Sequence, residues 1–367
     1  MFQKDKLLKV CFNILSRSRR FKIITKKLGL ALTMLPSALL IFGYLAVFLV
    51  DNLISFFFTL IIPALLVLNL IFGVYWLFRK NRFFLFPLIG VITYCFCFDS
   101  FLKFNLCGYS DLDKTSSKFD TLSILSYNTN GFKHDKDEND YDDSKRDTDD
   151  PIINFINNRN PDVFCIQEFS AIKYKYFSNY PYWFKTNIFT QNKSVMAIFS
   201  KYPIIDKGYI DFPNSSNGAM YVDLTFNKDI IRIYNLHLES YKMNAINQLN
   251  NPNSYSTLIT RISKAEKIRK EQVFIIKKHI DKFKGKVIIS GDFNSTQFSS
   301  TYNILKDSRK DSFIEAGSGF GKTYGLFKYP FRLDYILVDE SFDVISHQNF
   351  DLKLSDHEPI LTRLVVK

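Results

Sequence analysis

The sequence predicts an α/β domain that follows an N-terminal membrane region. Three apolar runs without charged residues crowd the first 106 residues, and strand-like runs alternate with amphipathic helical segments after residue 119. Short polar clusters stand where several of these strand-like runs end. The first observation indicates transmembrane helices, the second a sheet with covering helices, and the third a site at one edge of that sheet.

The apolar runs cover residues 28–50, 53–78 and 83–98. A membrane helix needs ~20 apolar residues to cross ~30 Å of hydrocarbon, so the first two runs are long enough. The third reaches that length as a span over 83–102. We therefore expect a membrane region over 28–106 with about three transmembrane helices (28–50, 53–78 and 83–102), a re-entrant or interfacial third segment being the alternative. A cleaved signal peptide fits poorly, because 27 mostly polar residues precede the first run.

Positive charge is concentrated around these runs. The chain has a formal net charge of +12, and residues 1–118 carry 15 Lys and Arg against 5 Asp and Glu. By the positive-inside rule, the basic tail over 1–27 and the turn over 79–82 stay in the cytoplasm. Three crossings then put the remaining chain outside, which for a bacterial inner membrane is the periplasm, whereas two crossings would leave it in the cytoplasm. The near-neutral remainder argues mildly against a processive DNA-binding protein.

A polar linker over 107–118 is expected to lead into one domain over 119–367. The acidic segment over 133–150 is interpreted as a solvated surface loop. Cys165 is the only cysteine of this domain and lies in an apolar run, so we expect a buried structural thiol and no disulfide framework. Periodicity predicts helices over 152–158 and 261–283, and strands over 121–127, 163–166, 195–199, 220–226, 230–236, 287–289, 333–338 and 360–366.

Polar side chains recur at the ends of these predicted strands. Any single Glu, His or Gly-Asp pair is more often structural than functional, but their repetition along one sheet edge indicates a site. Carboxylate and amide oxygens suit a hard cation such as Mg²⁺, and two histidines can provide acid and base for breaking a phosphate ester. The candidates are Asn128, Glu168, His237, Asp292, Asn294, Asp334, Asp356 and His357. His134, His279 and His347 are given no role.

Several motifs carry a family resemblance. They are Ser126-Tyr127-Asn128, Asp162 to Glu168, Phe199 to Ile204, Asn235-Leu236-His237-Leu238, Ser290 to Asn294, Arg332 to Tyr335 and Ser355-Asp356-His357. In order and spacing they resemble the endonuclease/exonuclease/phosphatase superfamily, which includes DNase I and exonuclease III. The resemblance implies a four-layer, two-sheet sandwich of the DNase I type over 119–367. It also implies hydrolysis of phosphate esters by water with the help of Mg²⁺, for which Mn²⁺ can substitute. The membrane-anchored layout is similar to that of a bacterial subgroup.

The resemblance also implies a role for each candidate residue. Glu168 is then the principal metal ligand, with Asn128 close by and Asp356 completing the shell. His357, oriented by Asp334, serves as the general base or stabilises the attacked phosphate. The remaining three are His237, which protonates or stabilises the leaving oxygen, and Asp292 with Asn294, which orient the attacking water and the phosphate.

Two departures from the family pattern leave the substrate open. Thr129-Asn130-Gly131 runs into the acidic segment where nucleases of the family often touch DNA, and Ser295 stands where many relatives carry an acid. Nucleic acid, phospholipid and sugar phosphate all remain candidates, as do one or two metal ions. The lipid bilayer is the expected partner of the N-terminal helices, and no protein partner is inferred. The alternative is a catalytically silent, membrane-tethered binding module that retains the fold.

Overall fold

A computed structural model describes Lys27 and residues 29–50, 53–103, 121–132, 150–186, 193–241, 252–326 and 329–367. The predicted basic tail over 1–27, the linker over 107–118 and the acidic segment over 133–150 therefore lie outside the described residues, apart from Lys27 and Asp150.

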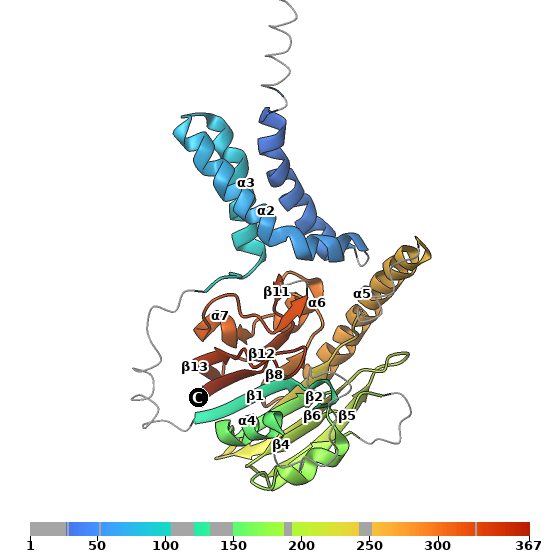
Figure 1. Cartoon of the computed structure of the whole chain (residues 1–367). Coiled ribbons are helices and arrows are strands. Elements are labelled where there is room, and N and C mark those ends of the chain that lie inside the picture. Colours follow the sequence, from blue (N-terminus) through green and yellow to red (C-terminus); the bar gives the residue numbers. More distant parts are fainter. Residues whose placement is uncertain are drawn as a thin grey trace, which may run out of the picture.

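Two six-stranded mixed sheets form the centre of the C-terminal domain (Figure 1). The first has the order β13 (Phe342–Asn349), β14 (Ile360–Val366), β1 (Thr121–Asn128), β2 (Val163–Gln167), β4 (Ala197–Ser200) and β3 (Tyr182–Lys185). The second has the order β5 (Ile204–Asp211), β6 (Gly218–Phe226), β7 (Asp229–His237), β8 (Lys286–Asp292), β12 (Asp334–Val338) and β9 (Lys310–Asp311). A separate hairpin pairs β10 (Tyr324–Leu326) with β11 (Tyr329–Phe331).

Side chains that alternate along the strands hold the layers together. Ile124 of β1 and Ile233 of β7 belong to the core between the two sheets, together with Cys165, whose burial raises the pKa of its thiol to about 12. The neighbouring Leu125 packs instead with the helix α4 (Pro151–Arg159), and Tyr234 packs with the helix α5 (Pro252–Ile280). Helices thus cover both outer faces, which confirms the predicted four-layer sandwich.

The predicted elements are largely present, and the differences have local causes. α5 begins nine residues before its predicted start, and Ile275 on its predicted apolar face is 37% exposed. The strands β5 and β13 were not predicted, because they are edge strands with many polar residues. The short helices α6 (Ser300–Lys306) and α7 (Ser312–Ala316) were also missed. His347 lies buried on β13 rather than in a polar turn.

Within the described residues, two N-terminal helices are long and apolar enough to cross a membrane: Gly29–Leu49 and α2 (Leu53–Phe78). Both agree with the predicted runs. Pro63 lies inside α2, and Figure 1 shows this helix bent, as expected where a proline removes a backbone hydrogen bond.

The third predicted span, over 83–102, is α-helical over only part of its length. The helix α3 covers only Leu85–Cys97, 13 residues, or about 20 Å at 1.5 Å per residue. It ends because the following residues contact the sheet domain: the ring of Phe98 lies 5.6 Å from that of Phe298, and Asp99 pairs with Lys306 at 2.9 Å. By itself α3 is shorter than the hydrocarbon layer.

The N-terminal helices pack directly on the domain that carries the polar clusters. Phe298 sits in one apolar cluster with residues of all three helices, and Lys103 pairs with Gly319 through two backbone hydrogen bonds. At the start of α2, the ring of Phe56 meets that of Tyr241 edge to face at 4.8 Å. Helices and sandwich therefore share a packed interface.

Candidate active site

The topology brings the predicted polar residues to one rim. The parallel strands β1 and β2 end at Asn128 and Gln167, and the parallel strands β7 and β8 end at His237 and Asp292. The antiparallel strand β12 begins at Asp334, directly opposite Asp292. Because these ends face the same way, their side chains can converge on one cavity.

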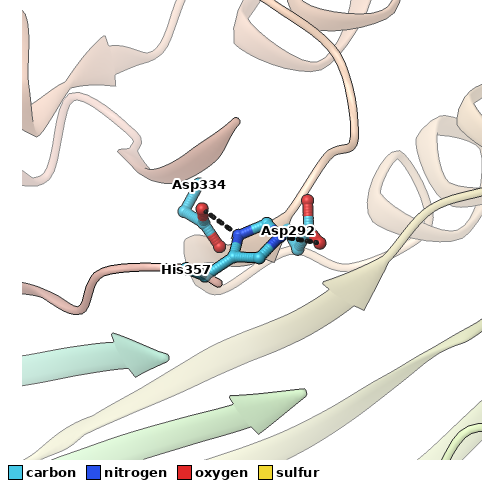
Figure 2. Close-up of side chains that lie close together, drawn as sticks. All are labelled: Asp292, Asp334 and His357. Atoms are coloured by element: carbon cyan, nitrogen blue, oxygen red, sulfur yellow. Dashed lines mark hydrogen bonds and ion pairs between the residues drawn. The ribbon is translucent and has the colours of Figure 1, made fainter. Parts of the chain in front are cut away.

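His357 lies between two buried carboxylates (Figure 2). Its Nδ1–H donates to Asp334 Oδ2 at 2.8 Å, and its Nε2 is 3.6 Å from Asp292 Oδ2. Burial by itself lowers the pKa of His357, but the carboxylates of Asp334 and Asp292 outweigh it and raise the pKa to about 10. The imidazole is therefore protonated at neutral pH.

Asp292 is the centre of the cluster. Its Oδ1 accepts the backbone N–H of Asn294 at 2.7 Å, and its Oδ2 accepts the side-chain amide of Asn128 at 3.1 Å. Burial raises the pKa of Asp292 to about 6, although both neighbouring histidines oppose the shift. A carboxylate with such a pKa is ionised at neutral pH and still basic enough to accept a proton.

The second histidine faces the same carboxylates. His237 Nε2 lies 3.7 Å from Glu168 Oε1 and 3.8 Å from Asp292 Oδ2, and its Nδ1 is 3.3 Å from the hydroxyl of Ser194. Burial lowers the pKa of His237, so the neutral ring predominates at pH 7. When Ser194 donates to Nδ1, the proton on Nε2 points at the carboxylates.

Two groups of side chains can hold a metal ion. Glu168, Asn128 and Asp356 line one cavity, and carboxylate and amide oxygens are the donors that Mg²⁺ prefers. Asn128 turns its amide nitrogen toward Glu168 at 3.4 Å, so in this arrangement it orients the carboxylate. The buried trio Asp292, Asp334 and His357 also offers ligand atoms within 4.8 Å of one another. The first group fits a hard cation better, since in the trio the imidazole is already paired with carboxylates.

All eight predicted residues thus lie in or directly behind the lining of one cavity. Asn128, Glu168, His237, Asp292, Asn294, Asp356 and His357 line a cavity of about 400 Å³. Asp334 stands behind His357. The left-handed backbone of Glu168 (φ 51°) and Asn294 (φ 48°) is a strained conformation of the kind that gathers at functional sites.

Some residues that support this rim are given no role by the sequence analysis. Gln167 donates to Asn235 at 2.6 Å and so ties the two sheets together beneath the site. Arg269 of α5 is fully buried and donates to the backbone carbonyl of Asn294 at 2.7 Å and to that of Glu239 at 2.9 Å. Nothing in the sequence distinguishes Arg269 from the other Lys and Arg residues of this amphipathic helix, which usually face solvent.

The comparisons with known proteins agree with this architecture. A structure titled as a functionally unknown conserved protein from Enterococcus faecalis superposes with a TM-score of 0.51 at 16% identity, covering 67% of this chain and 100% of that chain. An endonuclease/exonuclease/phosphatase family protein from Bacteroides thetaiotaomicron gives 0.50 at 17% identity, covering 68% of this chain and 99% of that chain. At such identities these structures establish the fold alone. Among curated proteins, none matches the sequence.

Two family models match the chain. A domain of unknown function (DUF8431) matches residues 25–101, the membrane-type helices. The model of the Endonuclease/Exonuclease/phosphatase family matches residues 125–357, a stretch that includes every predicted site residue. The chain therefore belongs to the endonuclease/exonuclease/phosphatase family.

Proposed function

We propose that this protein is a membrane-anchored, divalent-metal-dependent hydrolase of phosphate esters. The observation that carries the proposal is the convergence of Glu168, His237, Asp292 and His357 on one cavity. One protonated and one neutral imidazole, beside ionisable carboxylates, are the groups that hydrolysis of a phosphate ester needs.

Glu168 and Asp356 would hold Mg²⁺, or Mn²⁺ in its place, with Asn128 orienting Glu168. When bound, such an ion supplies positive charge to the phosphoryl oxygens. These residues support the assignment because they bring oxygen donors to the cavity that the histidines also face.

The chain's own groups account for the proton movements. Asp292, aligned by Asn294, accepts a proton from the attacking water while the new bond to phosphorus forms. His357 is protonated, so it donates to a non-bridging oxygen of the phosphate, and Asp334 keeps its ring in place. The bond between phosphorus and the leaving oxygen breaks as the new bond forms, and the neutral His237 stabilises that oxygen with an N–H hydrogen bond. The leaving oxygen takes a proton from solvent, and Asp292 returns the proton of the attacking water to solvent.

The test uses the full-length protein and aryl phosphate esters. We expect His357→Ala and Asp292→Ala to lower turnover by roughly 10³-fold or more, as removing a group from a catalytic constellation commonly does. EDTA should stop the reaction, and Mg²⁺ or Mn²⁺ should restore it. Near-normal turnover in either variant, or hydrolysis that resists EDTA, would exclude the proposal.

We also propose that the catalytic domain faces the periplasm of a bacterial inner membrane, with three crossings. The third, over α3, is short and is accommodated by local thinning of the bilayer. The first helix begins, and α2 ends, at the end of the helical region far from the catalytic domain (Figure 1). The basic tail and the turn over 79–82 flank those ends, which the positive-inside rule assigns to the cytoplasm. A reporter fused after Lys367 should be active outside the cytoplasm only, and cytoplasmic activity would reverse this topology.

A further inference from the structure

The cavity that holds the catalytic residues has a second, apolar wall. Phe56 and Leu60 of α2 and Leu258 and Ile262 of α5 line it, together with the carboxylates and imidazoles. None of these four side chains can contact a phosphate favourably.

The apolar lining continues away from the catalytic residues. A neighbouring cavity of about 390 Å³ is lined by Pro63, Phe101, Phe298 and Phe320. Thr59 and Phe331, with Thr296 and Tyr329, line both cavities. The two together form a path along α2 that is polar at the catalytic end and aromatic at the other.

This path runs beside a helix that can cross a membrane. α2 is one of the helices that can cross a membrane, and residues at its start form the cavity wall. Close to the wall, large apolar side chains are exposed: Phe57 at 55%, Ile259 at 47% and Phe320 at 50%. Exposed apolar side chains gathered beside a membrane helix are typical of a surface that touches lipid.

The charge of the lining argues against a polyanionic substrate. Among the described residues, no Lys or Arg lines the catalytic cavity. In the neighbouring cavity the guanidinium of Arg332 is paired with Asp311 at 2.6 Å. Nucleic acid binding depends on cationic side chains that contact successive phosphates, and this cavity does not provide them.

We infer that the substrate is the phosphate ester of a long hydrocarbon chain, a membrane lipid whose tail lies against Phe56, Leu60, Leu258 and Ile262 while its phosphate meets the catalytic residues. The inference rests on the proposed function and adds the substrate class. It gives the N-terminal helices a role in binding: they hold the active site at the bilayer and form part of the lipid site.

Matched esters separate the lipid site from the catalytic residues. Full-length protein in nanodiscs is assayed with dodecyl and ethyl phosphate, and with dodecyl and ethyl 4-nitrophenyl phosphate, so that monoesters and diesters are both covered. The measured quantity is the ratio of kcat/KM for the dodecyl ester to kcat/KM for the ethyl ester. Partition of the dodecyl chain into the bilayer is the same for every variant, so changes in this ratio report the protein.

Each of the two helices that form the apolar wall offers a matched pair of variants. Leu60→Ser and Leu258→Ser change lining residues, whereas Phe57→Ser and Ile259→Ser change exposed neighbours that do not line the cavity. We expect each lining variant to lower the ratio roughly tenfold, because the tail loses apolar contact area. The two exposed variants should keep the wild-type ratio, and thermal melting checks that all four fold.

Two negative results would have different meanings. If the ethyl esters are hydrolysed and the lining variants keep the wild-type ratio, the lipid inference is wrong and the proposed hydrolase stands. If no ester of either length is hydrolysed in the presence of Mg²⁺ or Mn²⁺, the proposed function itself fails.

Discussion

Replacing Asp334 by asparagine would isolate the charge that holds His357 in its protonated form. The asparagine Oδ1 can still accept the Nδ1–H of His357, so the ring keeps its orientation, whereas the negative charge 2.8 Å away is lost. Asp292 Oδ2 remains at 3.6 Å from the other ring nitrogen. The substitution therefore lowers the pKa of His357 from about 10 without removing the residue or its hydrogen bond.

The size of the effect follows from the burial of the pair. Asp334 and His357 are both buried, with 2% and 5% of their surface exposed, so solvent screens their interaction little. A hydrogen bond to a charged group contributes about 2–3 kcal/mol in such a setting. If this stabilises the imidazolium against the phosphate in the transition state, kcat should fall roughly 30- to 150-fold.

The same pair makes stability depend on pH. The folded-state pKa of His357 is raised above the usual 6.5, so the stabilisation is fully present below about pH 6.5 and is lost as pH rises through about 10. In the Asp334→Asn variant this decline in the free energy of unfolding should shrink and move to lower pH. Urea unfolding at several pH values measures it.

The assay compares kcat and KM for an aryl phosphate ester, with the pKa of His357 followed by NMR. Ser312→Ala is the matched control, because Ser312 contacts another buried histidine, His347, at 2.9 Å outside the catalytic cavity. Its kcat should stay within about twofold, as expected for a site that does not touch the reaction. A kcat within about threefold of wild type for Asp334→Asn would refute the role of the imidazolium.

Three further predictions address the metal, the base and the anchor. Glu168→Gln should weaken Mn²⁺ binding by roughly 10- to 100-fold in calorimetric titration. Unchanged affinity would assign the metal instead to the buried trio of Asp292, Asp334 and His357. As Asp292 titrates, kcat/KM should fall below about pH 6, and a flat profile from pH 5 to 8 would contradict its role as the base. The raised pKa of Asp292 also means that its contribution to stability, present below pH 3.8, is lost as pH rises through about 6. Phe298→Ala should cost about 3 kcal/mol, seen as a lower Tm in detergent, since this ring packs between the N-terminal helices and the sandwich.

Central strands could be predicted from sequence because each carries its own apolar signal. β14 agrees with its predicted range residue for residue, and β1, β2 and β7 agree within one or two. Edge strands such as β5 and β13 pair on one side only and keep polar residues, which weakens that signal. The length of α3 was overestimated because hydropathy does not reveal that Phe98 and Phe101 pack against Phe298.

The site was predictable for a related reason. Asn128, His237 and Asp292 each end a strand, so the polar residue after an apolar run in the sequence indicated a side chain at the sheet edge. Arg269 had no such marker. It lies on a helix, and its partners are the backbone carbonyls of residues 239 and 294, 30 and 25 positions away in sequence. Residues that position a site through tertiary contacts leave little trace in composition or spacing.

The wall that α2 contributes to the cavity is another feature that depends on tertiary contacts and leaves little trace in the sequence. Hydropathy indicated only that residues 53–78 could cross a membrane, and that property would suit a tether of any kind. Contacts between Phe56 and Tyr241, and the shared lining of Leu60 with His237 and Asp292, distinguish a tether from a part of the active site. If the helix were only a tether, Leu60→Ser would change kcat/KM for the ethyl and dodecyl esters by the same factor. If it forms the lipid site, this variant should lose the dodecyl preference selectively, because its catalytic residues are unchanged and its membrane helices are retained.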